Sequence, residues 1–413
     1  MRSTWIGALL VACAASAGGQ TLVEARKGFK TKLQKQDRDA EPLEVPPAGL
    51  FTIARYRGPA GGLQAYVGAA PTAPGKLPAI IWLTGGFPPA GAGSTAWEEV
   101  DLDNEQSARA YRNAGIYMMY PTTRGTAGNP GVQEGFLGEV DDVLAALEHL
   151  RTLPYVDAER IYLGGHSTGG TLALLVAACT DRFRAVFAFG PVASPSTYGQ
   201  DLAPYDVEDP GEARVRSPIH FLADVKSPTY VIEGATGNSE DLELLQAKSK
   251  NPALHFLPVA DSDHFELLSP TNRLIAKKIV QSARGGAELS LTPAEVQAAF
   301  QADRVASRQS DDLRTLADVR RLGVDLAVPV AVHHQVYADD RPALEALLAA
   351  AKKEGFEATP IEARRTRKGE EFFSADLKKT YALRDLDAVF AASAALDRLA
   401  RAREAYYGGW SVD

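Results

Sequence analysis

One serine of this chain stands where a nucleophile would. Residues 165–169, Gly-His-Ser-Thr-Gly, match the pattern G-x-S-x-G, in which Ser167 occupies a strained turn between a strand and a helix. Small residues flank such a turn because larger side chains would collide with it. An apolar, strand-like run precedes the motif at 161–163, and an apolar, helical run follows it at 172–178. This setting predicts an exposed nucleophile, with the main-chain N–H of Thr168 facing a developing oxyanion. The alternative is a glycine-rich turn that holds a buried serine.

A nucleophilic serine needs a general base, and imidazole is the usual one. Histidines follow Ser167 at five positions: His220, His255, His264, His333 and His334. His255 lies inside a strand-like run, whereas His264 lies in the polar loop just past it. His333 and His334 are adjacent in another strand, so they point to opposite faces and make a poor metal pair. We therefore predict His264 as the base, and we expect neither a cofactor nor a metal.

The oxyanion would need a second main-chain donor from another loop. Thr84-Gly85-Gly86-Phe87 follows an apolar strand at 79–83 and is a version of the lipase-type H-G-G loop, with Thr84 in place of the histidine. Glycines at this point let the backbone approach a substrate carbonyl. We predict that the N–H of Gly86 or Phe87 is that donor; a plain turn at the end of the strand is the alternative.

The acid that would orient the histidine is not identified by the sequence. It should follow the strand at 229–232, a few residues past a glycine, and the expected slot falls on Gly237 or Asn238, neither of which is a carboxylate. Asn238 as an amide, or Glu233 or Glu240 as a carboxylate, could take this place. A missing acid would leave the imidazole poorly oriented and cost orders of magnitude in rate.

Strands alternate with helices around these residues. Continuous apolar runs are typical of buried parallel strands, and the spacing predicts a doubly wound, mostly parallel α/β sheet that follows an antiparallel hairpin at 51–67. Right-handed crossovers would then bring the carboxyl ends of the strands, and the site, to one edge. The expected strands are 79–83, 116–120, 161–163, 185–189, 229–232 and 254–259; the expected helices include 105–113 and 140–150.

Length and composition indicate a folded protein of more than one domain. The chain has 413 residues, 45% of them hydrophobic, and a formal net charge of -8, which argues against a general nucleic-acid binder. We divide it into a leader (1–17), an N-terminal extension (18–46) that is charged and weakly helical at 21–39, an α/β domain (47–284), a helical connector (285–309) and a C-terminal domain (310–413).

The leader resembles an export signal. Arg2 precedes a short apolar run, and small residues follow it, which is typical of a secretory signal and too short to span a bilayer. Ala15-Ser16-Ala17 suits ordinary cleavage, whereas the run ending at Cys13 resembles a bacterial lipobox and would give a lipid-tethered protein. We expect an exported protein, periplasmic or membrane-anchored. A cytosolic protein with an apolar tip is the alternative.

Three runs, the last of which contains Ser167, carry a family resemblance. Residues 120–131 contain an Arg-Gly loop, 138–143 read Gly-Glu-Val-Asp-Asp-Val, and 154–170 read Pro-Tyr-Val-Asp-Ala-Glu-Arg-Ile-Tyr-Leu-Gly-Gly-His-Ser-Thr-Gly-Gly. Together they resemble the catalytic domain of prolyl oligopeptidase-like and dienelactone hydrolase-like proteins, over about 47–284. The resemblance implies an α/β-hydrolase that cleaves an ester or amide, with Ser167 as nucleophile and His264 as base. In the large peptidases of this family a β-propeller restricts access to the site, and no propeller precedes the domain here. We therefore expect either a small ester or a peptide as the substrate.

The C-terminal piece has its own pattern. A capping box with proline, Thr292-Pro-Ala-Glu295, opens a helix predicted over 293–308. The expected order is then strand 328–337, helix 342–354, strands 356–363 and 372–378, helix 386–405 and a final strand at 406–412, which is a β-α-β-β-α-β ferredoxin-like fold. Short motifs at 313–316, 321–329, 353–357 and 407–410 are similar to the regulator of ribonuclease activity B family. The resemblance implies a protein-binding domain.

Two hypotheses of different classes follow. The first is an exported serine hydrolase with an appended binding domain, acting on a small ester or peptide. The second is a catalytically silent α/β-hydrolase fold that serves as a scaffold, with the C-terminal domain binding a protein partner. The missing carboxylate favours the second, and the ordered set of Gly86, Ser167 and His264 favours the first.

Overall fold

The fold is taken from a computed structural model of the chain. It describes residues 19–88, 93–98, 100, 102–285, 289–366 and 369–412, and the side chains of 283–285 are left aside. The predicted leader and Cys13 lie outside these residues. In the described ranges no helix combines the length and the apolarity that a membrane span requires.

The described part of the large domain contains an eight-stranded sheet in the order β1-β2-β4-β3-β5-β6-β7-β8. β1 and β2 form the predicted antiparallel hairpin, β2 also pairs antiparallel with β4, and the remaining pairs are parallel. The expected α/β-hydrolase fold is therefore confirmed. The strands are β1 (Phe51–Gly58), β2 (Gly61–Gly68), β3 (Leu77–Leu83), β4 (Tyr117–Pro121), β5 (Val156–His166), β6 (Val186–Phe189), β7 (Thr229–Gly234) and β8 (Leu254–Val259).

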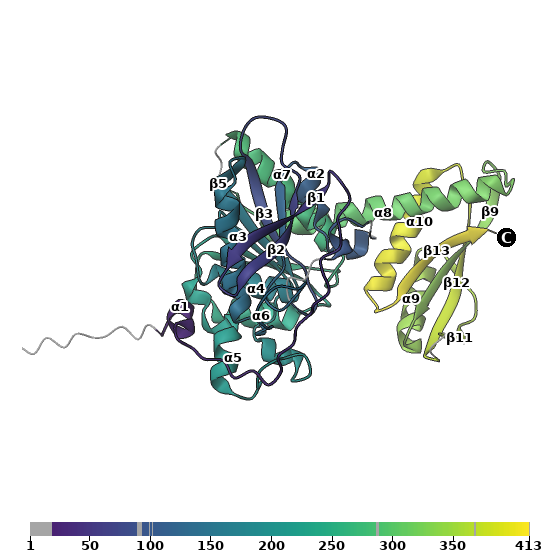
Figure 1. The fold of residues 1–413 in the computed structure, drawn as a ribbon. Helices are drawn as coiled ribbons and strands as arrows, with labels where there is room; N and C mark the ends of the chain where they lie inside the picture. Colours follow the sequence, from purple (N-terminus) through teal and green to yellow (C-terminus); the bar gives the residue numbers. More distant parts are fainter. Residues whose placement is uncertain are drawn as a thin grey trace, which may run out of the picture.

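Helices cover both faces of this sheet (Figure 1). Successive residues of a strand point to opposite faces, so Ile81 packs into one core cluster with α3 and α4, and Trp82 packs into another with α2 and α7. These two apolar layers hold the sheet between the helices and so position the strand ends. The helices are α1 (Leu22–Arg26), α2 (Arg109–Asn113), α3 (Gly138–Thr152), α4 (Thr168–Ala177), α5 (Pro210–Arg216), α6 (Ser239–Lys248) and α7 (Leu268–Gly285).

The N-terminal extension, predicted as weakly helical over 21–39, contains one short helix in its described residues. Only α1 forms, with Thr21 in a capping box and Leu22 fully buried. The segment after it is held by main-chain hydrogen bonds, from Gln34 to the Pro204 carbonyl and from Asp39 to the Gly125 carbonyl. Contacts with the large domain, rather than local helix propensity, therefore shape this segment.

The C-terminal domain has the predicted ferredoxin-like arrangement. Its antiparallel sheet has the order β10-β12-β9-β13, with β11 also paired to β12. The strand predicted over 356–363 is two short pieces, because Pro360 has no N–H to continue the ladder. The elements are β9 (Pro329–Ala338), α9 (Arg341–Lys353), β10 (Glu357–Ala358), β11 (Glu362–Arg365), β12 (Glu371–Ala382), α10 (Leu386–Arg401) and β13 (Tyr406–Val412).

A single long helix, α8 (Pro293–Arg321), runs from the large domain to the small one (Figure 1). Thr292 and Glu295 form the predicted capping box, with Pro293 at the first helical position. The helix passes the predicted end at 308 because the small domain stabilises its second half. There the buried Asp312 accepts hydrogen bonds from Trp410 Nε1 at 2.9 Å and from Ser393 Oγ at 2.8 Å.

Candidate active site

The candidate site lies where four neighbouring parallel strands end. β5, β6, β7 and β8 are consecutive in the sheet, so their carboxyl ends share one edge. Ser167 follows β5, Gly190 follows β6, Glu233 stands near the end of β7, and His264 lies in the loop after β8. The sheet thus gathers side chains that are about a hundred residues apart along the chain.

Ser167 has the conformation expected of a nucleophile turn. Its φ is 56° and its ψ is -118°, a left-handed conformation that costs a non-glycine residue energy. Cβ atoms placed on Gly165 or Gly169 would collide with neighbouring main chain, which explains the small residues around it. From Ile161 to Ala178, Ser167 is the one residue that is not fully buried. The fold therefore leaves Ser167 partly exposed and buries the residues around it.

His264 is paired with a buried carboxylate. Its Nδ1 lies 2.8 Å from Glu233 Oε2, and the side chain of Glu233 is fully buried while that of His264 is 16% exposed. Nδ1 carries the proton in this pair, since an ionised carboxylate only accepts hydrogen bonds. This leaves Nε2 as the nitrogen that is free to take a proton from a nucleophile.

Gly190 connects this pair to the serine. A Cβ placed on Gly190 would collide with the His264 ring and lie 2.7 Å from Glu233 Oε2. Phe189 precedes Gly190 in the chain, and its carbonyl accepts the main-chain N–H of Ser167 at 2.8 Å. The imidazole, the carboxylate and the backbone of the serine therefore all adjoin the end of β6.

The other acid candidates have different places. Asn238 donates its main-chain N–H to Glu233 Oε2 at 2.9 Å and its amide Nδ2 to the Gly190 carbonyl at 2.8 Å. Glu233 Oε1 accepts from the N–H of Gly234 at 2.6 Å. Glu240 is exposed in the first turn of α6. Of the three residues left open by the sequence, Glu233 is the one at the imidazole and Asn238 buttresses it. A carboxylate therefore lies beside the imidazole, so a missing acid does not favour a silent scaffold.

The predicted oxyanion loop is attached to the nucleophile turn. Thr168 Oγ1 donates to the Gly86 carbonyl at 2.6 Å, which fixes the loop after β3 against the start of α4. Among the described residues, no acceptor is recorded for the main-chain N–H groups of Gly86, Phe87 and Thr168. Donors left available beside a nucleophile are what an oxyanion requires.

His166, which the sequence analysis did not consider, supports the histidine loop from below. Its Nε2 lies 3.1 Å from the main-chain carbonyl of His264, and the two rings are 4.5 Å apart. Burial, and then the neighbouring His264, lowers the pKa of His166 to about 3, so it is neutral and donates to that carbonyl. Its place inside the nucleophile motif was the available signal for a positioning role.

Aromatic side chains border the oxyanion loop. The ring of Phe87 lies 5.0 Å from that of Tyr198, in the short 3-10 helix Pro195–Tyr198, and 6.3 Å from that of Phe136. They enclose a narrow cavity of about 20 Å³, with room for roughly one water molecule. An apolar wall thus stands next to the predicted oxyanion donors.

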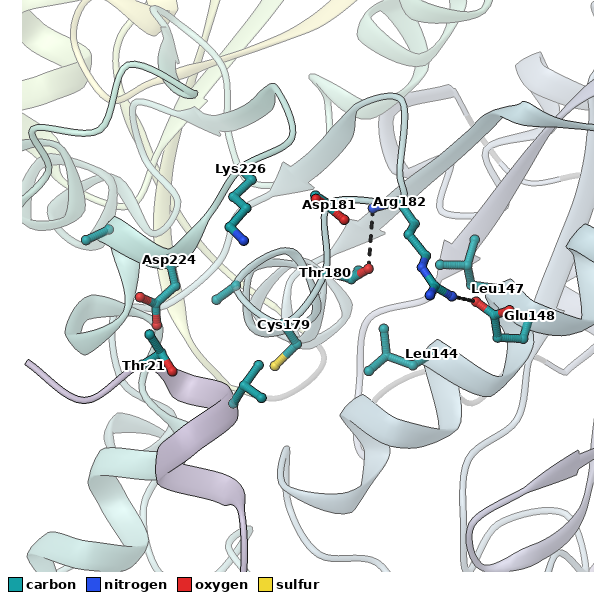
Figure 2. A pocket seen from close by; sticks show the side chains of 13 residues that line it. Thr21, Leu144, Leu147, Glu148, Cys179, Thr180, Asp181, Arg182, Asp224 and Lys226 are labelled. Atoms are coloured by element: carbon teal, nitrogen blue, oxygen red, sulfur yellow. Dashed lines mark hydrogen bonds and ion pairs between the residues drawn. The ribbon is translucent and has the colours of Figure 1, made fainter.

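A wider groove lies elsewhere and lacks the catalytic candidates. The volume of this groove is about 660 Å³. Figure 2 shows its lining side chains, with Cys179 and Leu144 in the lower part of the view and Lys226 and Asp224 higher up. Its lining combines α1, the second half of α3, the loop after α4 and the segment before β7, and includes neither Ser167 nor His264.

Two of the remaining histidines lie apart from Ser167, in other contacts. In the C-terminal domain, His334 is buried between two hydroxyls, with Nδ1 2.8 Å from Tyr407 Oη and Nε2 3.0 Å from Tyr381 Oη. His255 lies exposed on β8, stacked on Tyr230. Within the described ranges, no group of His, Cys, Asp and Glu side chains has the arrangement of a metal site.

Comparison with known proteins identifies the two regions. Residues 107–236 match the prolyl oligopeptidase family, and residues 309–412 match the regulator of ribonuclease activity B family. Both resemblances are therefore confirmed. The first match includes Ser167 and Glu233 but not Gly86 or His264. No curated protein sequence matches the chain.

Several solved hydrolases are similar in part. A puromycin hydrolase is 16% identical with a TM-score of 0.45, over 57% of this chain and 40% of its own. The 2,6-dihydroxy-pseudo-oxynicotine hydrolase is 17% identical with a TM-score of 0.44, over 59% of this chain and 71% of its own. The acylaminoacyl peptidase of Pyrococcus horikoshii is 17% identical with a TM-score of 0.44, over 60% and 45%. The match thus spans less than half of the puromycin hydrolase and of the peptidase.

Proposed function

We propose that this chain, which joins a region of the prolyl oligopeptidase family to a domain of the regulator of ribonuclease activity B family, is a serine hydrolase that cleaves an ester or amide. The observation that carries the proposal is the buried carboxylate of Glu233 at 2.8 Å from His264 Nδ1, on the strand edge that exposes Ser167. A catalytic triad is recognised by geometry rather than by sequence position, and the pairing of imidazole and acid supports this one.

In the first step, Ser167 Oγ attacks the substrate carbonyl carbon while His264 Nε2 takes the hydroxyl proton. Glu233 holds the ring in the tautomer with the proton on Nδ1 and stabilises the imidazolium that forms. The carbonyl oxygen becomes an oxyanion, and the N–H groups of Thr168 and of Gly86 or Phe87 stabilise it.

In the second step, the tetrahedral intermediate collapses. His264 Nε2 returns its proton to the leaving alcohol or amine, and the acyl group stays on Ser167 as an ester. A water molecule then attacks this ester by the same route, with His264 again as base, and releases the acid and the free serine. The proton from Ser167 goes to the leaving alcohol or amine, and the proton from water returns to Ser167. The His264 imidazole is therefore neutral at the end of the cycle.

The substrate class is to be decided by assay. The apolar wall of Phe87, Phe136 and Tyr198 beside the oxyanion loop favours an acyl or leaving group with apolar surface. Short-chain and aromatic p-nitrophenyl esters, tested beside p-nitroanilide dipeptides, would separate an esterase from a peptidase.

A fluorophosphonate probe tests the reaction class directly. We expect the wild type to be labelled on Ser167, identified by mass spectrometry of the peptide, and Ser167→Ala to lose both labelling and turnover. Cys179→Ser, which changes a nucleophile in the distant groove, is the control and should keep both. Ester turnover that survives Ser167→Ala would overturn the proposal.

We also propose that the C-terminal domain binds a protein partner and that the chain is exported. The partner proposal is supported by the match of residues 309–412, and the export proposal by the apolar leader with Cys13. Mass spectrometry of the N-terminal peptide distinguishes cleavage after residue 17 from lipid on Cys13. An intact, unmodified N-terminus would contradict export.

A further inference from the structure

The loop that carries His264 is shared between the two domains. It runs from Ala260 to Glu266, and Asp261 has a left-handed φ of 59°. Asp263 Oδ1 accepts the N–H groups of Phe265 and Glu266, each at 2.8 Å, which closes a tight turn around the histidine. On the sheet side this loop rests on His166. β8, which leads into the loop, is the last strand of the sheet in the part of the chain that the structure describes.

Helix α8 holds the start of this loop. Gln297 forms two hydrogen bonds with the main chain of Ala260: its Oε1 accepts the N–H at 2.7 Å, and its Nε2 donates to the carbonyl at 3.1 Å. Two turns along, on the same face of the helix, Arg304 Nη1 donates to the Asp261 carbonyl at 3.5 Å. The helix that joins the domains therefore fixes the backbone of the loop.

The C-terminal domain holds the end of the loop. Arg401, in the last turn of α10, donates from both terminal nitrogens to the two carboxylate oxygens of Glu266, each at 2.9 Å. Such a bidentate pair has a defined geometry as well as an attraction. The two side chains are 32% and 18% exposed, so solvent screens this pair less than it would a fully exposed one.

A network of charges ties Arg401 to α8. Asp397, one turn before Arg401, is paired with Arg304 and lies 3.1 Å from Arg308 and 3.5 Å from Arg401. α8 and α10 pack against each other in the small domain (Figure 1). A shift of this domain would therefore move the contacts at Ala260 and at Glu266 together.

We propose that the C-terminal domain controls the hydrolase by positioning His264, with Arg401 acting through Glu266 as the positioning residue. The proposal rests on the proposed function. It makes the small domain part of the working enzyme rather than a passive attachment, and it gives a partner of that domain a direct route to the catalytic loop. A partner that draws α10 away from Glu266 would lower turnover, and one that fixes α10 would sustain it.

The test compares Arg401→Met with Arg398→Met in the full chain. Arg398 lies exposed on the same helix, so both variants lose one charge from α10. We expect Arg401→Met to lower kcat about tenfold with KM within about twofold, since a displaced base slows chemistry more than binding. Arg401→Lys should restore part of the rate, and Arg398→Met should match the wild type. Hydrogen exchange of amides 260–266 should rise in Arg401→Met alone.

A double-mutant cycle with Glu266→Gln shows whether Arg401 acts through this carboxylate. We expect the double variant to be no slower than either single variant. Losses in kcat that multiply would overturn the proposal, as would an Arg401→Met enzyme as fast as the Arg398→Met control. A wild type that fluorophosphonate does not label would overturn the proposed function itself. Labelling of the wild type, with equal rates in the two arginine variants, would overturn only the domain control.

Discussion

At the scale of single residues, the proposed reaction depends on the charge of Glu233. Glu233→Gln keeps the shape of the acid but removes the negative charge that stabilises an imidazolium at His264. We expect kcat to fall on the order of a thousandfold to ten-thousandfold, as when an acid of this kind is replaced by its amide. Glu240→Gln, an exposed acid a few residues along the chain, should stay within about twofold of the wild type in the same ester assay. Equal rates in the two variants would contradict the role of Glu233.

The packing behind the imidazole can be tested at Gly190. Gly190→Ala would place a methyl group against the His264 ring, whereas Gly199→Ala, at another left-handed glycine, meets nothing within 4 Å. Both variants should lose about 1 kcal/mol of stability from the backbone conformation. Only Gly190→Ala should also lose turnover, by about a hundredfold, because the base is displaced. Ester turnover and thermal unfolding measured side by side separate the two effects.

The same residues show how far the sequence determines the site. The places of Ser167 in a strand-to-helix turn and of His264 in a loop after a strand could be predicted, because a local motif and a polar loop are both visible in one dimension. The sequence does not identify the acid, because the position expected for it lies a few residues beyond Glu233. Glu233 is the charged residue at the end of an otherwise apolar strand, and that charge in a buried position was the signal for it. His166 was missed because its contact is to a carbonyl 98 residues away.

At the scale of elements, a buried ion pair joins α3 to the loop after β4. Arg124 donates to both oxygens of Asp142 at 2.9 Å, and the side chain of Asp142 is fully buried. We expect Asp142→Asn to lower the free energy of unfolding by about 3 kcal/mol, because it leaves a buried guanidinium without its main partner. Asp141→Asn, whose side chain is 43% exposed in its pair with Arg26, should cost under about 1 kcal/mol. Urea unfolding midpoints measure both, and similar midpoints would contradict the burial argument.

Element boundaries were predictable where local signals agree with the tertiary setting. The buried strands and α3 follow directly from apolar runs and helical periodicity. The end of α8 was placed thirteen residues early, at 308 rather than 321, because the buried hydrogen bonds of Asp312 lie with partners near the C-terminus. The pairing of residues 21–39 with the large domain could not be predicted, because local propensity does not register main-chain contacts to distant parts of the chain.

At the scale of the whole molecule, the division into two domains was visible in the sequence, but their docking was not. The contact between Arg401 and Glu266 joins residues that are 135 positions apart, and neither residue belongs to a motif. Shifts in composition and helix-capping residues mark the boundary between the two domains. The charges on two surfaces reveal their pairing only when the helices between them are in place.

Two buried neutral histidines, one in each domain, make the stability of the molecule depend on pH. Burial first, then neighbouring charges, lowers the pKa of His166 to about 3 and that of His334 to about 4. The unfolded chain protonates both near pH 6.5, so it binds more protons than the folded chain below that pH. Their contribution is therefore fully present above pH 6.5 and is lost as the pH falls toward 4.

The size of this effect can be measured at His334, which lies outside the proposed active site. At pH 5 each histidine should cost on the order of 2 kcal/mol of the stability present at pH 7.5. In His334→Gln, an amide still faces the hydroxyls of Tyr381 and Tyr407 but does not titrate, so the loss between pH 7.5 and pH 5 should shrink by about that amount. Urea unfolding at the two pH values, followed by circular dichroism, gives both differences. A variant that loses as much stability as the wild type would show that protonation of His334 does not oppose the fold.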